Sequence, residues 1–212
     1  AGVHRRVEVV RRPVAREDAL VVRCRVRPGI LDIVEDYPPK CFFDRAAMQI
    51  VLFEPEIPPN TGNVARLSAA ARIPLHLIEP LGFCIEDRYL KRAGLDYWPH
   101  VQIKVWPDFS AFLTGLAQDE VSSAALPRLI ATSARRGVPV HKFSFRPDDI
   151  LVFGPETRGL PETILEKTQA AVRIPIRGEV RSLNLSTAVG IVVYQALAAS
   201  GELDHWAMDE EG

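Results

Sequence analysis

Polar side chains and constrained residues gather in three short stretches, and the first of them is PPNTGNVAR at residues 58–66. Its two prolines stiffen the chain, Asn60 or Thr61 can cap a helix, and Gly62 lets the backbone come close to a partner. Arg66 follows about one turn into the expected helix. An arginine on a capped helix is most often a solvated side chain. So many constrained residues are unusual in a plain connector, however, and this favours a functional role for Arg66.

The second stretch, GPETRGLP at residues 154–161, directly follows a short apolar run that fits a buried strand. Its glycines and prolines fix the backbone amides and carbonyls, which then suit hydrogen bonds to a ribose or an adenine edge. It is not a P-loop, because no Gly-Lys-Ser/Thr follows, and it is not a G-x-G-x-x-G fingerprint. Glu156 either has a structural role, as a cap or as a partner of Arg158, or holds a substrate group.

The third stretch, residues 174–186, lies at the start of a long apolar segment and contains Ser182, Asn184 and Ser186. A helix N-cap accounts for one of these three polar residues and not for all of them. The beginning of a helix also favours a negative or electron-rich ligand group. This stretch therefore predicts a binding function beside the helix.

Alternating strands and helices position the three stretches. The pattern predicts an α/β protein with a parallel sheet covered by helices on both faces. A ligand crevice is expected where neighbouring parallel strands end. The expected strands are residues 49–53, 75–79, 101–106, 128–132, 150–153 and 172–176, and the expected helices are residues 63–72, 86–93, 108–117 and 184–200.

Composition narrows the class of protein. The chain has 212 residues, of which 47% are hydrophobic and 25% charged, and its net charge of -1 does not indicate nucleic-acid binding by the chain as a whole. Three cysteines without a C-x-x-C motif predict neither a zinc site nor a disulfide framework, and five scattered histidines predict no metal centre. No apolar run approaches the roughly 20 residues of a membrane span. We expect a cytoplasmic protein.

Residues 1–47 differ from the remainder, because ten lysines and arginines stand there against seven acidic residues. They are either a basic arm that helps to bind nucleic acid or a weakly ordered extension translated from upstream of a natural start at Met48; we favour the extension. The run VVRCRV nevertheless alternates like an exposed strand.

The three stretches, in this order, closely resemble the SPOUT class of methyltransferases, in which the C-terminal chain forms a deep trefoil knot. EPEIPPNTGNVAR, RAGLDYW and FGPETRGLP are similar to the family that methylates the 2′-hydroxyl of wobble nucleotide 34 of tRNA, a cytidine or a modified uridine, in leucine isoacceptors. The resemblance covers Met48 to about Ser200. It implies a methyltransferase domain at residues 48–212, S-adenosylmethionine as donor, tRNA as partner, and a homodimer with sites at the interface.

Carried over residue by residue, the resemblance assigns roles to particular positions. A ribose hydroxyl is a weak acid, so we expect Arg66, which stays protonated, to activate it electrostatically rather than as a base. Asn60, Asn184 and Ser186 complete the catalytic set, and Asn184 and Ser186 are expected to orient the ribose. The donor contacts, mostly through backbone groups, fall at Thr132 (where the family more often has an apolar residue), Gly154, Ile174, Ser182 and Leu183. Substrate contacts are expected at Glu156, Arg88, Arg92 and Arg135.

Three alternatives stay open at this point. The first is a related SPOUT enzyme that acts on another tRNA or ribosomal RNA site. The second is a knotted RNA-binding protein that has lost catalysis, against which the intact polar motif positions argue. The third is an unrelated Rossmann-like nucleotide binder, which the missing G-x-G-x-x-G disfavours.

Overall fold

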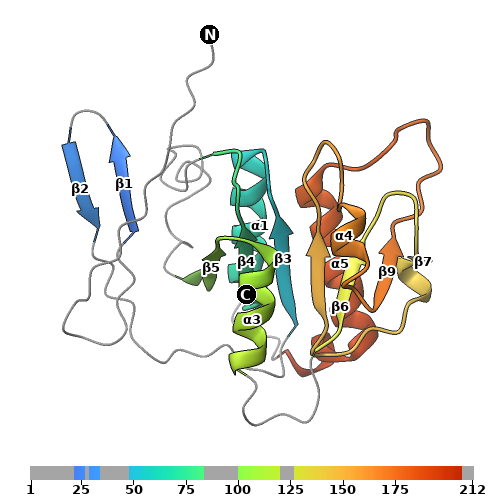
Figure 1. Ribbon diagram of the computed structural model, residues 1–212. Coiled ribbons are helices and arrows are strands. Elements are labelled where there is room, and N and C mark those ends of the chain that lie inside the picture. The colour runs from blue at the N-terminus through green and yellow to red at the C-terminus, as the bar shows by residue number, and fades with distance from the viewer. Residues whose placement is uncertain (1–21, 27–28, 34–47, 84–99, 120–126, 207–212) are drawn as a thin grey trace, which may run out of the picture. The chain divides into compact units, whose positions relative to one another are not determined.

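The computed structural model describes residues 22–26, 29–33, 48–83, 100–119 and 127–206. Within them, a parallel sheet of seven strands has the order β5-β4-β3-β8-β6-β9-β7 (Figure 1). Every neighbouring pair in this sheet runs parallel. The strands are β3 (Gln49–Phe53), β4 (Leu75–Ile78), β5 (Ile103–Trp106), β6 (Leu129–Thr132), β7 (Val138–Pro139), β8 (Ile150–Phe153) and β9 (Ala170–Arg173).

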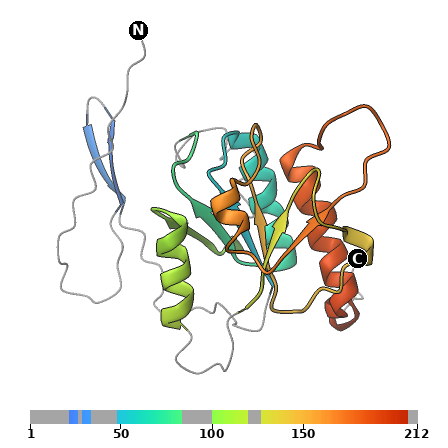
Figure 2. The ribbon, with the colours of Figure 1, turned by 45° about the vertical axis from the view of Figure 1, so that its right-hand side comes forward.

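Helices cover both faces of the sheet, as the alternating pattern predicts (Figures 1 and 2). On one face, α1 (Pro58–Ala71) and α5 (Leu185–Ser200) share a hydrophobic core with Ile50, Leu52 and other strand residues. On the other face, α3 (Phe109–Asp119) and the short α4 (Glu162–Leu165) pack against Val51, Val152 and their neighbours. The central strands β3, β4 and β8 are buried along their whole length. This double burial explains why they read as continuous apolar runs rather than as alternating ones.

Two elements have a predicted boundary that is wrong by three residues or more, and the other predicted elements within the described residues differ from prediction by two residues at most. Helix α1 begins at Pro58 rather than at residue 63, because Pro58 and Pro59 stand in its first turn, where a missing N–H costs nothing. Strand β9 spans residues 170–173 rather than 172–176, and Pro175, which has no backbone N–H to donate, lies beyond its end. Within residues 140–145, a single 3-10 turn, Val140–Lys142, is present. The helix predicted at residues 86–93 lies outside the described residues.

The chain divides into two units, residues 1–43 and 44–212. In the first unit, β1 (Val22–Val26) and β2 (Gly29–Ile33) form an antiparallel pair in which Arg23 faces Asp32. The alternation in VVRCRV therefore does mark a strand. The favoured interpretation of residues 1–47 as an extension stays a prediction.

Candidate functional site

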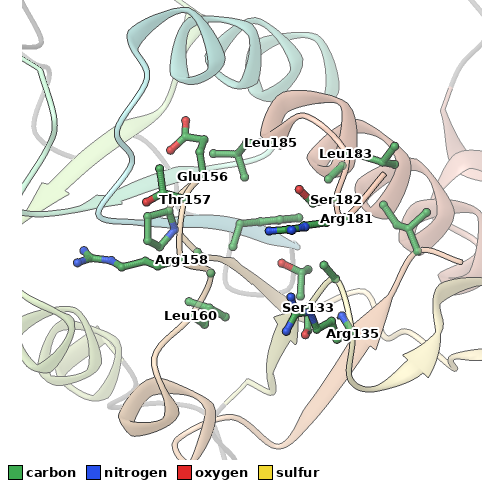
Figure 3. Close-up of a pocket in the computed structure, with 18 of the residues that line it drawn as sticks. Ser133, Arg135, Glu156, Thr157, Arg158, Leu160, Arg181, Ser182, Leu183 and Leu185 are labelled. Atoms are coloured by element: carbon green, nitrogen blue, oxygen red, sulfur yellow. Dashed lines mark hydrogen bonds between the residues drawn. The ribbon is translucent and has the colours of Figure 1, made fainter. Parts of the chain in front are cut away.

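A crevice of about 750 Å³ opens where β6, β8 and β9 end (Figure 3). The chain segments that follow β6 and β8, together with the segment between β9 and α5, line it. Adjacent parallel strands ending together are the usual place for a ligand in an open α/β sheet. The volume lies within the range of small-molecule pockets. Nine of the predicted site residues line this crevice: Asn60, Thr132, Arg135, Gly154, Glu156, Ile174, Ser182, Leu183 and Asn184.

The loop after β8 folds back onto itself at Gly154. A Cβ atom at this position would lie 2.4 Å from the backbone nitrogen of Leu160 and 2.5 Å from the carbonyl carbon of Gly159. No side chain fits there without moving the backbone, so glycine is required for the turn. The turn brings backbone amides and carbonyls to the wall of the crevice, beside the apolar side chain of Leu160.

The carboxylate of Glu156 joins the loop after β8 to the start of α1. It accepts hydrogen bonds from the backbone N–H groups of Glu56 (2.9 Å) and Ile57 (3.2 Å) and from the side-chain amide of Asn60 (2.9 Å). The two backbone N–H groups belong to Ile57, the N-cap residue of α1, and to the residue before it, so the carboxylate fixes the segment that leads into α1 and interacts favourably with the helix dipole. Of the two roles considered for Glu156, the structural role is the one seen in these contacts.

A second exchange of hydrogen bonds fastens the same two loops. The carboxylate of Glu56 accepts from the hydroxyl of Thr157 at 2.8 Å and from its backbone N–H at 3.1 Å. Arg158 forms an ion pair with Glu54, not with Glu156. Residues 54–56 and 156–158 are thus held together by the carboxylates of three glutamates, Glu54, Glu56 and Glu156, although about 100 positions separate the two segments in sequence.

An amide pair extends this network to α5. The side-chain NH₂ group of Asn184 donates to the side-chain oxygen Oδ1 of Asn60 at 2.8 Å. Its own carbonyl oxygen accepts from the backbone N–H groups of Ser186 and Thr187, at 2.9 and 3.3 Å, and from the Ser186 hydroxyl at 2.7 Å. Asn184 is therefore the N-cap of α5 and also the connection between α5 and α1. Four predicted site residues, Asn60, Glu156, Asn184 and Ser186, belong to one hydrogen-bonded network.

Arg66 lies apart from this network. It is an exposed residue of α1, six positions after Asn60, or about 9 Å farther along the helix axis, and it does not line the crevice of its own chain. Ser186, the second residue of α5, also lies outside the lining. Arg88 and Arg92 lie outside the described residues.

The turn after β6 contributes backbone to the crevice. The hydroxyl of Thr132 donates to the carbonyl oxygen of Val152 at 3.0 Å, so this side chain is occupied within the sheet and the main chain of Thr132 is what the crevice meets. The hydroxyl of Ser133 accepts from the backbone N–H groups of Arg135 (3.2 Å) and Arg136 (3.1 Å), which fixes the turn.

Sequence reasoning missed Arg181, Ser133 and the contacts that Glu54 and Glu56 make with the loop after β8. Arg181 directly precedes Ser182, so its position in the third stretch was a usable signal. No spacing rule relates Glu54 or Glu56 to partners on a loop about 100 residues later.

A buried histidine lies away from the crevice. His76 of β4 is bonded to Gln49 Oε1 through Nε2 at 3.0 Å and accepts at Nδ1 from Trp106 Nε1, also at 3.0 Å. Burial, with a smaller contribution from the charge of Lys104, lowers the pKa of His76 to about 3. The residue is a neutral part of the core. Within the described ranges, no group of three or more His, Cys, Asp and Glu side chains is arranged to hold a metal ion, and no helix is long and apolar enough to cross a membrane.

Comparisons with known proteins relate the chain to RNA methyltransferases. Residues 47–194, which include all three loops, match the model of the SpoU rRNA Methylase family. A tRNA (cytidine(34)-2′-O)-methyltransferase of Yersinia pestis is 50% identical over 152 residues, which cover 70% of this chain and 91% of that protein.

Solved structures are similar as well. One that concerns the 2-OH methylation of C/U34 on tRNA is 47% identical, with a TM-score of 0.66, and the match covers 74% of this chain and 97% of that one. The SpoU methyltransferase AviRb of Streptomyces viridochromogenes, in complex with the cofactor AdoMet, shares the fold at 20% identity and a TM-score of 0.67, over 82% of this chain and 66% of that one.

Proposed function

This chain belongs to the SpoU methylase family and, within it, to the tRNA (cytidine(34)-2′-O)-methyltransferases, and from that membership we propose how its crevice works. The enzyme methylates the 2′-hydroxyl of nucleotide 34 of tRNA. The observation that carries the assignment of the site is the network of Glu156, Asn60, Asn184 and Ser186 at one edge of the crevice.

We place S-adenosylmethionine in the crevice, where it supplies an electrophilic methyl group on its sulfonium sulfur. The close turn at Gly154, which a Cβ would fill, and the apolar side chains of Leu160, Leu183 and Ile174 suit a flat base bound through backbone groups. Main-chain atoms of Thr132, Gly154, Ile174, Ser182 and Leu183 hold the donor. That role agrees with the Thr132 hydroxyl being engaged by the neighbouring strand.

The target ribose lies beside the start of α5. Both ends of the Asn184 amide are occupied, so its orientation is fixed before substrate arrives. The Ser186 hydroxyl donates a hydrogen bond to Oδ1 of Asn184. Its lone pairs remain available to accept a hydrogen bond from a ribose hydroxyl. Asn60 and Asn184 position Ser186, and Glu156 holds Asn60 in place.

Arg66 acts on the crevice of a second copy of the chain. It is exposed on α1, outside the crevice lining of its own chain, so a homodimer that places it in the partner's site explains its position. The exposed side of α5 supports such an interface, because Ile191 (39% exposed) and Tyr194 (44%) present apolar surface there. Trp206 (38%), which lies beyond the end of α5, adds to it, and its ring centroid lies 6.3 Å from that of Tyr194. A permanently charged guanidinium there lowers the cost of the developing alkoxide.

The remaining assignments rest on the family resemblance. Arg135, exposed at the crevice, and Arg88 and Arg92 contact the tRNA backbone. The chain after β8 forms a trefoil knot, consistent with the side-by-side placement of the loops after β6, β8 and β9. Leucine isoacceptors with a cytidine or a modified uridine at position 34 are the substrates, and the enzyme works in the cytoplasm as a homodimer.

The test is methyl transfer from labelled S-adenosylmethionine to total tRNA of a strain that lacks this gene, with the modified nucleotide mapped. We expect a 2′-O-methyl group at position 34 of leucine tRNA. Label at another nucleotide would move the substrate to a different RNA site. Donor binding without any labelled RNA would favour the alternative of an RNA-binding protein.

Complementation between variants tests the shared site. Arg66→Ala and Asn184→Ala are each expected to lose most turnover while S-adenosylhomocysteine still binds. In a mixed dimer, the crevice of the Arg66→Ala chain meets an intact Arg66 from the Asn184→Ala chain, so random exchange restores about one quarter of the sites. If the mixture stays as inactive as the separate variants, Arg66 does not act across a dimer interface.

A further inference from the structure

The lining of the crevice carries more positive charge than its partners neutralise. Four arginines line it, Arg135, Arg136, Arg158 and Arg181, together with two glutamates, Glu156 and Glu162. Arg136 pairs with Glu162 at 3.0 Å and Arg158 pairs with Glu54. The carboxylate of Glu156 is occupied by three N–H donors. Counting only the part of the chain that the structure describes, no carboxylate lies within ion-pair distance of Arg135 or Arg181.

The two remaining arginines come from different loops. Arg135 follows β6, on the turn that the Ser133 hydroxyl fixes. Arg181 precedes the N-cap of α5, and Figure 3 shows it extending into the hollow, whereas Arg158 points away from it. Arg181 therefore presents its charge beside Ser182 and Asn184, where the target ribose is placed.

The donor does not account for this charge. S-adenosylmethionine carries a sulfonium and an ammonium group against a single carboxylate, so it is itself a net cation at neutral pH. A crevice that also keeps two uncompensated guanidinium groups suits a bound anion. RNA supplies one in the phosphate group on each side of a ribose, and the guanidinium of arginine matches a phosphate through two parallel hydrogen bonds.

We propose that Arg181 binds a phosphate group of the tRNA backbone next to the methylated ribose, with Arg135 as a second contact from the turn after β6. This deepens the proposed function and depends on it. The contact fixes the register of the anticodon loop, so that the 2′-hydroxyl of nucleotide 34, rather than that of a neighbour, reaches Ser186 and the methyl group.

The salt dependence of tRNA binding tests the contact. Arg181→Gln removes the charge, and Arg177→Gln is the matched control, because Arg177 is exposed on the same loop but does not line the crevice. Each neutralised phosphate of a single strand contributes about 0.7 to the slope of log K against log salt. We expect Arg181→Gln to reduce the slope by about that amount and to weaken tRNA binding on the order of tenfold. Arg177→Gln should change the slope much less.

The binding of S-adenosylhomocysteine, measured by calorimetry on the same proteins, separates the possible origins of an effect. We expect it to be unchanged in Arg181→Gln. Loss of this binding with an unchanged salt slope would mean that Arg181 holds the donor's carboxylate and would overturn the proposal. An equal loss of slope in Arg177→Gln would also overturn it, because the charge would then act diffusely. The wild-type methylation assay stands apart, since tRNA left unmethylated at position 34 would refute the proposed function and not merely this contact.

Discussion

The carboxylate of Glu156 accepts hydrogen bonds from Glu56, Ile57 and Asn60, and these contacts are called the carboxylate clamp below. Replacing Glu156 by glutamine tests whether this clamp holds the site together. The charged oxygens accept three hydrogen bonds, two from backbone N–H groups and one from the amide of Asn60. In Glu156→Gln the remaining oxygen keeps the bonds from Ile57 and Asn60, which share Oε1, but the new NH₂ group is a donor and faces the N–H donor of Glu56. The geometry and size of the side chain change little, so the effect isolates charge and acceptor capacity.

The magnitude follows from the number and exposure of these bonds. Hydrogen bonds to a charged group each contribute about 1.5–3 kcal/mol, but Glu156 is half-buried and water weakens them. A loss of about 2 kcal/mol is the reasonable sum. For a domain of this size, such a loss lowers the melting temperature by about 4–8 °C. Because the oxygen that accepts from the Asn60 amide loses its charge, and Asn60 orients Asn184, kcat should fall on the order of tenfold.

Thermal unfolding and methyl transfer measured together are the assay. Glu166→Gln is the control, since Glu166 is an exposed glutamate on the segment after α4, away from the crevice lining. It should leave both quantities unchanged. If Glu156→Gln melts within about a degree of wild type, the three hydrogen bonds add no stability and the clamp has been misjudged. If it melts lower but turns over at the normal rate, the clamp stabilises the fold without positioning Asn184.

Three further predictions concern the core and the interface. Asp149→Ala, which removes a fully buried carboxylate that holds Arg128 through two 2.8 Å bonds, should cost about 3 kcal/mol in urea unfolding. His76 stays neutral when folded, whereas the unfolded chain takes up a proton near pH 6.5. Stability should therefore fall as the pH drops from about 6.5 towards 3, by about 1 kcal/mol between pH 7.5 and 5.5, a loss that His76→Gln should lack. Tyr194→Glu should turn the proposed dimer into monomers in sedimentation velocity, because it charges an exposed apolar face.

The sheet could be predicted from the sequence because most of its strands are buried on both faces. Runs such as residues 49–53 and 150–153 are short and mostly apolar, as buried strands are, and both strands appear with those bounds. The predicted start of β9 was wrong because its first residues lack this apolar pattern. Ala170 and Ala171 are weak strand formers, and pairing with β6 draws them into the sheet. Helix α1 begins earlier than predicted because the prediction assigns Pro58 and Pro59 to a loop, whereas proline is also common in the first turn of a helix.

The identity of the polar residues in the site could be read from the sequence, but not their partners. Asn60, Glu156 and Asn184 stand out because each follows an expected strand or precedes an expected helix. That Glu156 bonds to the segment that leads into α1, and that Asn184 meets Asn60, depends on the strand order, which brings β3 and β8 together from distant parts of the chain. Arg181 escaped notice for a different reason, since a charged residue in an exposed loop is usually solvated.

The hydrogen-bonded network separates the predicted site residues into two groups. Glu156, Asn60 and Asn184 bond to one another and to backbone N–H groups, so little of their hydrogen-bonding capacity is left for a ligand. In the proposed mechanism, what remains for substrate is the Ser186 oxygen, the Arg181 guanidinium and the partner's Arg66. Because α1 carries both Asn60 and Arg66, the contacts that fix the start of α1 in one chain would, in the proposed dimer, also fix the arginine offered to the other. In the proposed dimer, a disturbance at Glu156 should therefore reach both active sites, its own through Asn184 and the partner's through Arg66.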